Sequence, residues 1–255
     1  MVILRTIWFW LSFWVVTLLL FLKMFFVRLF LPKGSEKTEP CHQVACEWGQ
    51  WVFKVNPGWK VTVKGRENLP ALGSCTVIVA NHKSAMDICA LFATGIPFRW
   101  LSKDLVFKFP LMGQAMKWSG YVPVKRGNPQ SHKVALDMSI GWLRKGVSML
   151  YFPEGTRSET GELRPFKMGA FNIAASEDCS ITPIVLVDTD TLMKKNSLFV
   201  AGGAHVIIDV LKPMRPFEGE DLKDFKDRVR EVIQKKCFYY AKEKKNPALV
   251  PAFEN

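Results

Sequence analysis

The stretch TVIVANHKSAMD, residues 76–87, decides how this chain folds and where its chemistry lies. Its first five residues form an apolar run that predicts a buried strand. Ser84 and Asp87 make an S-x-x-D capping pattern, which predicts a helix that starts at Ser84. His82 then lies in the turn between strand and helix, and such turns on a rigid sheet often carry functional side chains.

His82 and Asp87 have the residue types of a catalytic pair. A carboxylate beside a histidine can orient the ring and stabilise its protonated form. Asp87 follows His82 by five residues, so turn geometry rather than helical spacing must bring the two together. Taken alone, the pair also has a structural explanation, with Asp87 as a helix cap and His82 bonded to backbone. A second motif is needed to choose between the two.

The second motif is FPEGTRS, residues 152–158, at the end of another apolar run. Pro153 stops the predicted strand because it has no N–H for the ladder, and Gly155 permits a tight turn with exposed amides. Glu154 and Arg157 are thereby presented at a strand end. An isolated F-P-E-G is more typical of a charged turn with an internal ion pair, so the catalytic interpretation depends on both motifs together.

Together the two motifs resemble those of the glycerophospholipid acyltransferase family. The family's block N-H-x-x-x-x-D matches Asn81, His82 and Asp87, and its block F-P-E-G-T-R-S matches in full. Further blocks match at 120–126, which ends in Arg126, and at 181–185, and Lys103 lies upstream of the former as in the family. The resemblance covers roughly residues 65–211, in the family's order. Pro123 departs from the pattern and puts the local strand geometry in question.

The resemblance implies a role for each matched residue. His82 is expected to act as general base on the acceptor hydroxyl, held by Asp87. The turn at Gly155 is a candidate donor to the oxyanion of the reaction. The residues expected to bind the acceptor and its phosphate are Lys103, Arg126, Glu154, Gly155, Thr156 and Arg157. No metal and no cofactor is implied.

The implied activity is transfer of an acyl group from acyl-CoA or acyl-carrier protein to the sn-2 hydroxyl of 1-acyl-sn-glycerol 3-phosphate, giving phosphatidic acid. Glycerol 3-phosphate or another lysolipid is the alternative acceptor. A non-catalytic membrane-surface scaffold is the alternative of a different class, but it gives no reason for a His-Asp pair and arginines at strand ends. A serine lipid hydrolase needs a G-x-S-x-G elbow, which the sequence lacks.

Residues 1–34 have the composition of a membrane anchor. The segment from Thr6 to Leu22 is almost wholly apolar, and as a helix it is about 25 Å long against about 30 Å of hydrocarbon. A short span, a re-entrant hairpin and an interfacial helix reaching Leu31 all fit, whereas a cleaved signal peptide fits poorly. Positive charges are denser after the run than before it, which predicts a catalytic domain on the cytoplasmic face, and the cell inner membrane for a bacterium.

The net charge of +12 favours a partner that is anionic. Nucleic acid is not expected, because the basic and aromatic residues form no recognised binding signature. An anionic membrane surface attracts lysine and arginine by about 1 kcal/mol each. The pairs Arg99–Trp100 and Lys117–Trp118 and the triplet 107–109 mix cations with aromatics, which predicts a face that rests on lipid.

The six cysteines and four histidines show no metal-binding spacing. Cys41, His42 and Cys46 are the nearest to a cluster, which we interpret as incidental. Cys75 and Cys89 flank the first strand and helix and have the character of small buried hydrophobes. A domain that faces the cytoplasm is expected to keep its thiols reduced.

Strands and helices alternate along the chain, which predicts an α/β fold with a mixed, mostly parallel sheet flanked by helices, preceded by a hydrophobic membrane helix or helical hairpin. The expected strands lie near 61–63, 76–80, 98–102, 120–124, 147–152, 181–187 and 205–210. The expected helices lie at about 84–94, 105–118, 130–145, 167–176 and 219–242. The expected organisation is a membrane anchor (1–34), an approach segment (35–60), a catalytic domain (61–245) and a tail (246–255).

Overall fold

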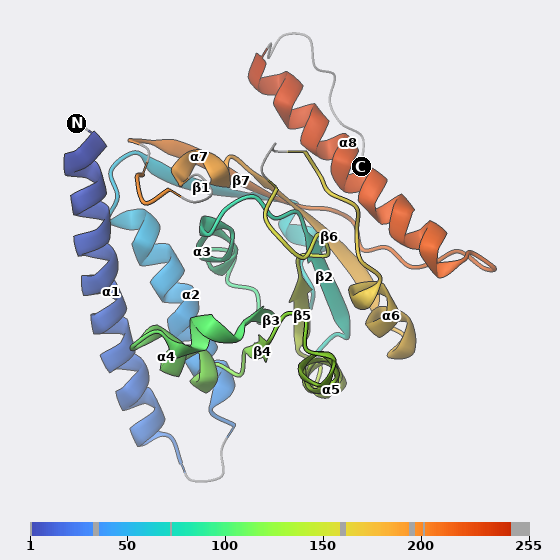
Figure 1. Ribbon diagram of the computed structural model, residues 1–255, viewed down its shortest axis with the longest axis horizontal. Helices are drawn as coiled ribbons and strands as arrows, with labels where there is room; N and C mark the ends of the chain where they lie inside the picture. Colours follow the sequence, from blue (N-terminus) through green and yellow to red (C-terminus); the bar gives the residue numbers. More distant parts are fainter. Residues whose placement is uncertain are drawn as a thin grey trace.

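The computed structural model describes residues 2–32, 36–71, 73–158, 162–193, 197–200 and 202–245 of the chain. One sheet of seven strands runs through it in the order β1-β7-β6-β2-β5-β3-β4 (Figure 1). The strands are β1 Trp59–Lys64, β2 Thr76–Ala80, β3 Phe98–Lys103, β4 Val122–Val124, β5 Ser148–Tyr151, β6 Ser180–Val187 and β7 Ala204–Val210. Every neighbouring pair is parallel except β6 and β7, so the predicted mixed, mostly parallel sheet is confirmed.

Eight α-helices and two 3₁₀ turns accompany the strands in the described residues. They are α1 Val2–Phe30, α2 Thr38–Lys54, η1 Arg66–Asn68, α3 Met86–Phe92, η2 Asp104–Lys108, α4 Met112–Trp118, α5 Pro129–Arg144, α6 Gly169–Ser176, α7 Thr189–Leu192 and α8 Leu222–Lys245. The helix expected over 105–118 is divided into η2 and α4. The division falls at Pro110, which cannot donate a helical hydrogen bond, and Leu111, whose φ is 59°.

Two layers of helices cover the two faces of the sheet (Figure 1). Ile78 and Ala80 of β2 belong to the apolar cluster shared with α1, α2 and α3. Val77 and Val79, the alternate residues, belong to the cluster shared with α5, α6 and α8. Since side chains alternate along a strand, the continuous apolar run at 76–80 is what a strand buried on both faces requires.

Helix α2 lies in the segment expected to be an approach to the domain, where no helix was predicted. Pro40 is tolerated because it lies in the first turn of the helix. Gly49 allows α2 and α3 to approach closely, since a methyl group there would lie 2.5 Å from Cβ of Phe92 and 2.7 Å from the carbonyl oxygen of Cys89. These two residues usually argue against a helix, which is why the pattern was missed.

Helix α1 packs along α2 in the opposite direction. Trp8 Nε1 donates to the carbonyl of Val55 at 2.8 Å, and Trp48 Nε1 donates to Thr17 Oγ1 at 3.0 Å. Phe9 of α1 is 1% exposed and lies in the same cluster as the strand residues. One face of α1 therefore belongs to the core that covers the sheet, and the expected boundary at 34 falls between two helices of that layer. The expected tail, 246–255, lies outside the described residues.

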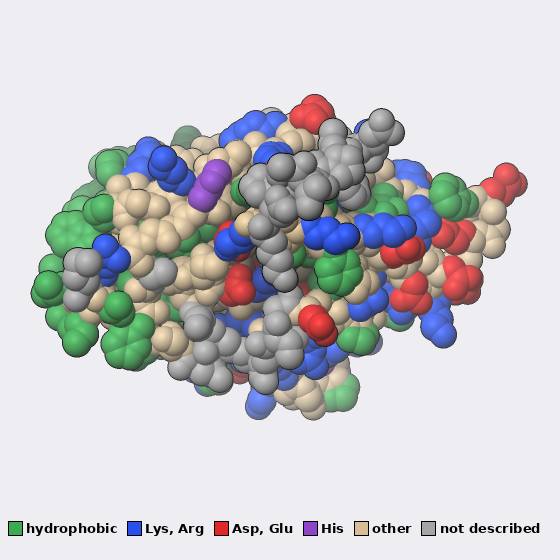
Figure 2. Space-filling model, turned by 90° about the horizontal axis from the view of Figure 1, so that it is seen from above, with side chains coloured by type: hydrophobic (Ala, Val, Ile, Leu, Met, Phe, Trp, Pro, Cys, Tyr) green, Lys and Arg blue, Asp and Glu red, His purple; other side chains and the backbone are tan. Residues whose placement is uncertain are grey.

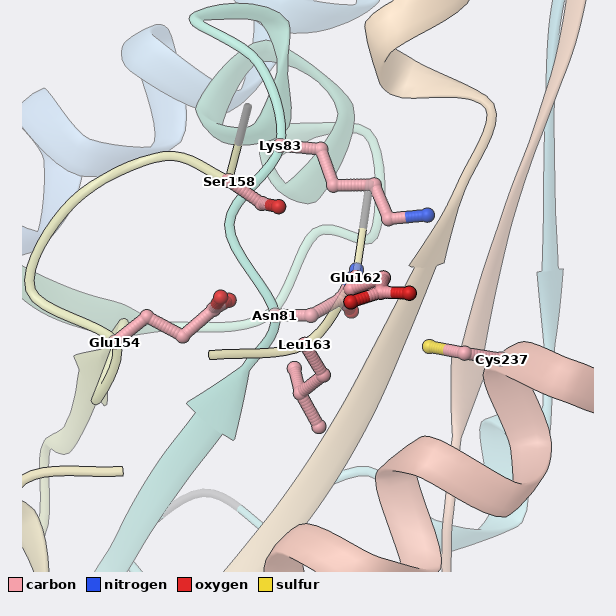
Figure 3. A pocket seen from close by; sticks show the side chains of 7 residues that line it. All are labelled: Asn81, Lys83, Glu154, Ser158, Glu162, Leu163 and Cys237. Carbon is pink, nitrogen blue, oxygen red and sulfur yellow. The ribbon is translucent and has the colours of Figure 1, made fainter. Parts of the chain in front are cut away.

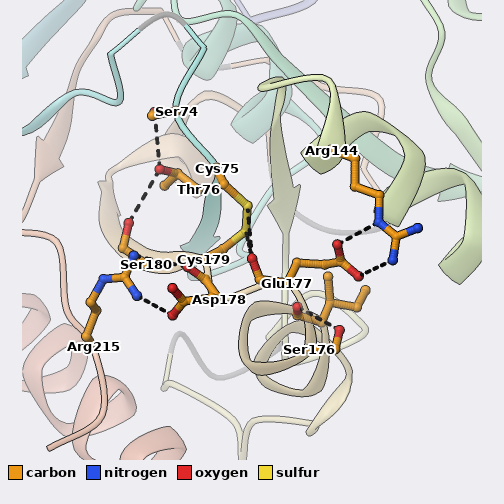
Figure 4. Close-up of a disulfide and its surroundings, with 11 residues drawn as sticks. Ser74, Cys75, Thr76, Arg144, Ser176, Glu177, Asp178, Cys179, Ser180 and Arg215 are labelled. Carbon is orange, nitrogen blue, oxygen red and sulfur yellow. Dashed lines mark hydrogen bonds and ion pairs between the residues drawn. A yellow bond between two sulfur atoms is a disulfide. The ribbon is translucent and has the colours of Figure 1, made fainter.

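Cys75 and Cys179 form a disulfide, so the expectation of reduced thiols is wrong for this pair (Figure 4). The two residues precede β2 and β6, whose first residues Thr76 and Ser180 are register partners. The sheet thus places their Cα atoms 5.1 Å apart, within the range that a disulfide spans. The sequence does not show this proximity because 104 residues separate the two cysteines.

The expected lipid-facing cations and aromatics do not share one face. Arg99 is completely buried, with its guanidinium 3.1 Å from Glu39 of α2 and stacked over the ring of Trp142. Phe107 is buried in the core, whereas Phe109, two residues on, is 55% exposed. The expectation is therefore wrong for Arg99 and Phe107, whose side chains hold α2 and the 3₁₀ turn η2 to the sheet.

Candidate active site

The matched motifs meet at one edge of the sheet. Strands β2, β5, β3 and β4 are parallel to one another, so their carboxyl ends lie on the same side. His82 follows β2, and Glu154 follows β5. Lys103 ends β3, where it is the register partner of Val124, two residues before Arg126. Pro123 causes no conflict, because β4 is an edge strand.

His82 and Asp87 form the expected pair. His82 Nδ1 lies 2.7 Å from Oδ2 of Asp87, and the carboxylate is completely buried while the histidine side chain is 21% exposed. The backbone N–H groups of Lys83 and Ser84 also donate to Oδ2, at 2.8 and 3.0 Å. With Nδ1–H directed at the carboxylate, Nε2 is the nitrogen that can accept a proton from a substrate.

The loop that carries the pair is held on both sides. Asn81 exchanges two hydrogen bonds with the backbone of Leu186 on β6, at 2.9 and 2.7 Å. Ser84 Oγ accepts from the N–H of Met86 at 3.2 Å, while Asp87 accepts from the N–H of Ser84. The expected capping contact from Asp87 is thus present, but α3 begins at Met86 rather than at Ser84.

The FPEGTRS motif, residues 152–158, packs directly on His82. The ring of Phe152 stacks on the imidazole, with centroids 4.1 Å apart and planes inclined by 19°. The N–H of His82 donates to Glu154 Oε1 at 2.7 Å, and its carbonyl accepts from the N–H of Ser158 at 2.9 Å. Both backbone polar groups of the histidine are therefore bound by the motif that starts at Phe152.

Glu154 is buried, and backbone amides occupy both of its oxygens. Oε2 accepts from the N–H of Arg164 at 2.9 Å, in addition to the contact of Oε1 with His82. Burial raises the pKa of this carboxyl, and the two amide hydrogen bonds oppose that rise. A carboxylate engaged in this way holds two loops together, whereas the family resemblance suggested that it contacts the acceptor.

The N–H of Gly155 is engaged within its own turn, so an oxyanion donor from this turn stays a prediction for the other amides of the turn. The Gly155 N–H donates to the carbonyl of Phe152 at 3.0 Å, closing the turn. The φ of Gly155 is 71°, which explains the glycine. The carbonyl of Gly155 accepts from Nη2 of Arg126, so the block at 120–126 and the FPEGTRS motif are joined at this turn.

Cations surround the same turn. Arg126 and Lys103 are exposed at the ends of their strands, and Thr156 and Arg157 are half-buried in the loop after Gly155. Lys167, which was not among the expected site residues, lies across the turn, since a methyl group at position 155 would be 2.8 Å from its Nζ. Among the described residues, neither Arg126 nor Lys167 has a carboxylate within ion-pair distance.

A small pocket lies between the two motifs and α8 (Figure 3). Its lining residues are Asn81, Lys83, Glu154, Ser158, Glu162, Leu163 and Cys237. Its volume of about 10 Å³ is enough for about one water molecule. Burial raises the pKa of the Cys237 thiol, and Lys83 partly offsets the rise. This pocket lies behind the histidine loop and is too small for a lipid.

His42 and Cys46 belong to the core rather than to a site. His42 is buried, with its ring nitrogens 2.9 Å from the hydroxyl of Tyr121 and from the carbonyl of Ile96. Within the described residues there is no group of three His, Cys, Asp or Glu side chains that could hold a metal ion.

Comparisons with known proteins agree with this geometry. A family model described as Acyltransferase matches residues 60–187. A 1-acyl-sn-glycerol-3-phosphate acyltransferase of Borreliella burgdorferi is 33% identical over 185 residues, which are 70% of this chain and 72% of that protein. The chloroplastic 1-acyl-sn-glycerol-3-phosphate acyltransferase LPAT1 of Arabidopsis thaliana is 37% identical over 173 residues, which are 68% of this chain and 48% of that protein.

The chain spans about half the length of LPAT1 and of its counterparts from Brassica napus and Chlamydomonas reinhardtii. The crystal structure of the 1-acyl-sn-glycerophosphate acyltransferase PlsC from Thermotoga maritima superposes with a TM-score of 0.78 at 25% identity, covering 94% of this chain and 96% of that one. The matched region contains both strand-end motifs and the strands that present them. On this agreement of motifs, sheet and sequence, the chain belongs to the acyltransferase family.

Proposed function

We propose that this chain moves an acyl group from an acyl thioester to the sn-2 hydroxyl of 1-acyl-sn-glycerol 3-phosphate, giving phosphatidic acid. The observation that carries the proposal is the 2.7 Å contact between His82 and Asp87, one loop away from the cations at the Gly155 turn. A base for a hydroxyl and cations for a phosphate are what this acceptor needs. Several similar proteins are named for this acceptor.

The proposed reaction needs no nucleophile from the enzyme. Nε2 of His82 takes the proton of the acceptor hydroxyl as the oxygen attacks the thioester carbonyl. The tetrahedral intermediate collapses, the C–S bond breaks, and the proton on His82 goes to the leaving thiolate. Asp87 stabilises the imidazolium between the two proton transfers.

Arg126, Arg157 and Lys103 are the proposed ligands of the acceptor phosphate. Arginine suits this role because its planar donors can bind two phosphate oxygens together. Arg126 reaches the Gly155 carbonyl, so its guanidinium lies within the same turn that carries Arg157. Thr156 lies between these groups and is a further candidate contact through its hydroxyl. We assign Glu154 to the support of His82, on the basis of its two amide contacts.

The proposed acceptor is a lipid, and α1 is the proposed contact with the membrane. This helix is long and apolar enough to cross a bilayer, with a mean hydropathy of 2.1. One of its faces packs on α2, however, while Leu4, Leu11 and Leu18 are 72, 61 and 47% exposed. Figure 2 shows hydrophobic side chains gathered at the end of the molecule where α1 lies, with charged groups over α8. This arrangement favours a helix that lies in the interface plane.

Extraction with alkaline carbonate tests the proposed position of α1. An interfacial helix should be released from membranes by this treatment, whereas retention in the pellet would indicate a span. The cytoplasmic face remains a prediction from the charge distribution, which protease accessibility in oriented membranes tests.

An acceptor–donor panel tests the proposed activity. The purified chain should consume acyl thioester with 1-acyl-sn-glycerol 3-phosphate and should be slow with glycerol 3-phosphate and with 1-acylglycerol, which lacks the phosphate. Acyl-CoA and acyl-carrier protein, offered in parallel, identify the donor. Preference for glycerol 3-phosphate would establish the alternative acceptor, and no turnover with any combination would favour a membrane-surface scaffold.

A further inference from the structure

The C-terminal helix α8 reaches the catalytic loop through one side chain. Arg230 Nη2 donates to the carbonyl of Leu163 at 2.9 Å, and its Nε donates to the carbonyl of Arg164 at 3.2 Å. The guanidinium thus binds two consecutive carbonyls of the segment that follows the FPEGTRS motif. Leu163 lines the small pocket beside Glu154 and opposite Cys237 of α8 (Figure 3). Arg230 lies beyond residues 60–187, which the family model matches.

The peptide group between Leu163 and Arg164 is bound at both ends. Its carbonyl accepts from Arg230, and its N–H donates to Glu154 Oε2 at 2.9 Å. The other oxygen of Glu154 accepts from the N–H of His82 at 2.7 Å. A continuous chain therefore runs from the Arg230 guanidinium through one peptide group and the carboxylate to the backbone of the catalytic histidine.

The charged groups at the two ends of this peptide, the Arg230 guanidinium and the Glu154 carboxylate, polarise it in the same direction. A cation at a peptide carbonyl polarises the group and makes its N–H a better donor, and a carboxylate is the acceptor that gains most from this. Glu154 is buried, so its carboxylate depends on these amides to replace water. Without Arg230, the segment 162–167 keeps the contact of the Lys167 N–H with Pro153, at 2.9 Å, but the bridging peptide loses its polarising partner.

We propose that Arg230 is a positioning residue for His82, acting through the 163–164 peptide and Glu154. It binds no substrate in this proposal and sets where the imidazole lies relative to the acceptor hydroxyl. Displacement of a catalytic group by about 1 Å can cost about 10²-fold in rate. Loss of Arg230 should therefore lower kcat and leave the acceptor KM nearly unchanged.

Hydrogen–deuterium exchange tests the chain of contacts without reference to catalysis. Arg230→Met keeps the aliphatic stem and removes the donors, and it should speed exchange of the Arg164 and His82 amides by about tenfold. Arg228→Met is the matched control, because Arg228 pairs with Glu220 at 2.6 Å, toward the start of the same helix. Unchanged exchange at both amides in Arg230→Met, or equal changes in Arg228→Met, would overturn the proposal whether or not the proposed activity holds.

The kinetic arm rests on the proposed function and uses the acceptor that the wild type turns over. Arg230→Met should lower kcat about tenfold, Arg230→Lys less, and Arg228→Met not at all. In a Glu154→Gln background the effect of Arg230→Met should largely disappear, because the chain is already broken. Multiplicative losses in the double variant, or a raised acceptor KM at unchanged kcat, would overturn the proposal. If Arg230→Met does not fold, Arg230→Lys serves in both arms.

Discussion

Asp87→Asn separates the charge of the carboxylate from its geometry. Oδ2 of Asp87 accepts three N–H groups, from His82 Nδ1 and from the backbone of Lys83 and Ser84. An asparagine oxygen can accept the same three, whereas its amide nitrogen in that place would face two backbone donors. The two backbone amides should therefore hold the asparagine in the orientation of the aspartate, and His82 should keep its tautomer.

The expected loss then comes from the missing negative charge beside the imidazolium. Two unit charges about 4 Å apart at an effective dielectric constant of about 20 interact by about 4 kcal/mol, and a charge-assisted hydrogen bond exceeds a neutral one by about 1 kcal/mol. Between these limits kcat should fall by about 5- to 1000-fold. The melting temperature should fall modestly, because all three hydrogen bonds survive but the amide nitrogen takes the place of Oδ1, which is buried with no hydrogen-bond partner in the described residues, at about 1–3 kcal/mol.

Asp87→Ala is the contrasting variant. It leaves the partly buried amide of Lys83 and the buried amide of Ser84 without an acceptor, at up to about 1–3 kcal/mol each, so it should lose more stability than Asp87→Asn as well as rate. His82→Ala sets the scale, since removal of a general base costs about 10²–10⁴. The assay is thioester consumption with lysophosphatidate in detergent, beside thermal melts.

Two outcomes would refute this reasoning. Wild-type turnover in Asp87→Asn would show that the carboxylate charge is not used in catalysis. A folded Asp87→Asn that loses much more than about 1000-fold in kcat would show that the amide has turned its nitrogen to the ring, so the backbone donors do not fix its orientation.

Three further predictions follow from particular contacts. Arg126→Ala and Arg157→Ala should each lower acceptor kcat/KM by about one to two decades, since a charge-assisted contact is worth about 1.5–3 kcal/mol. The thioester KM and the use of 1-acylglycerol should stay unchanged, and an equal loss with this phosphate-free acceptor would contradict a phosphate role. Burial lowers the pKa of His42 to about 3 from about 6.5, so the neutral ring contributes its full share of folding stability above about pH 6.5. Below about pH 6.5 the free energy of unfolding should fall by up to about 1.4 kcal/mol per pH unit, and urea melts at about pH 7 and 5 should show a smaller fall in His42→Gln. A thiol titration should find four thiols in denatured, non-reduced protein and six after reduction, and six before reduction would rule out the Cys75–Cys179 bond. Loss of this bond should cost about 2–4 kcal/mol of stability without changing kcat.

Periodicity predicted most of the fold because buried strands leave a direct mark on sequence. The run at 76–80 is apolar throughout, since helices cover both of its faces. Helix α2 left no such mark, because its proline and glycine are explained only by its first turn and by the close approach of α3. The partner of Cys75 was equally hidden, because strand order decides which residues 104 positions apart become neighbours.

The site shows the same division between residue identity and backbone contact. Side-chain types at strand ends, together with the family resemblance, predicted that His82 would meet Asp87. They could not show that the N–H of Gly155 is used within its own turn, nor that Glu154 accepts two amides, because backbone hydrogen bonds depend on the folded path of the loop. Arg230 was missed for this reason as well, since its partners are carbonyls, which every residue has.

The FPEGTRS motif consequently has two kinds of residue, and mutations of the two kinds should have different effects. Phe152, Glu154 and Ser158 contact His82 itself, through its ring, its N–H and its carbonyl. For Arg157 and Arg126 the proposed role is contact with the acceptor phosphate, and Arg126 donates to the carbonyl of Gly155, two residues before Arg157. Loss of the Phe152 ring or of the Glu154 carboxylate should lower kcat for every acceptor, because the base itself moves, whereas Ser158 contacts His82 through its own backbone N–H, which a side-chain substitution keeps. The loss of activity on mutation of Arg157 or Arg126 should depend on whether the acceptor carries a phosphate. The acceptor panel therefore distinguishes support of the histidine from recognition of the lipid.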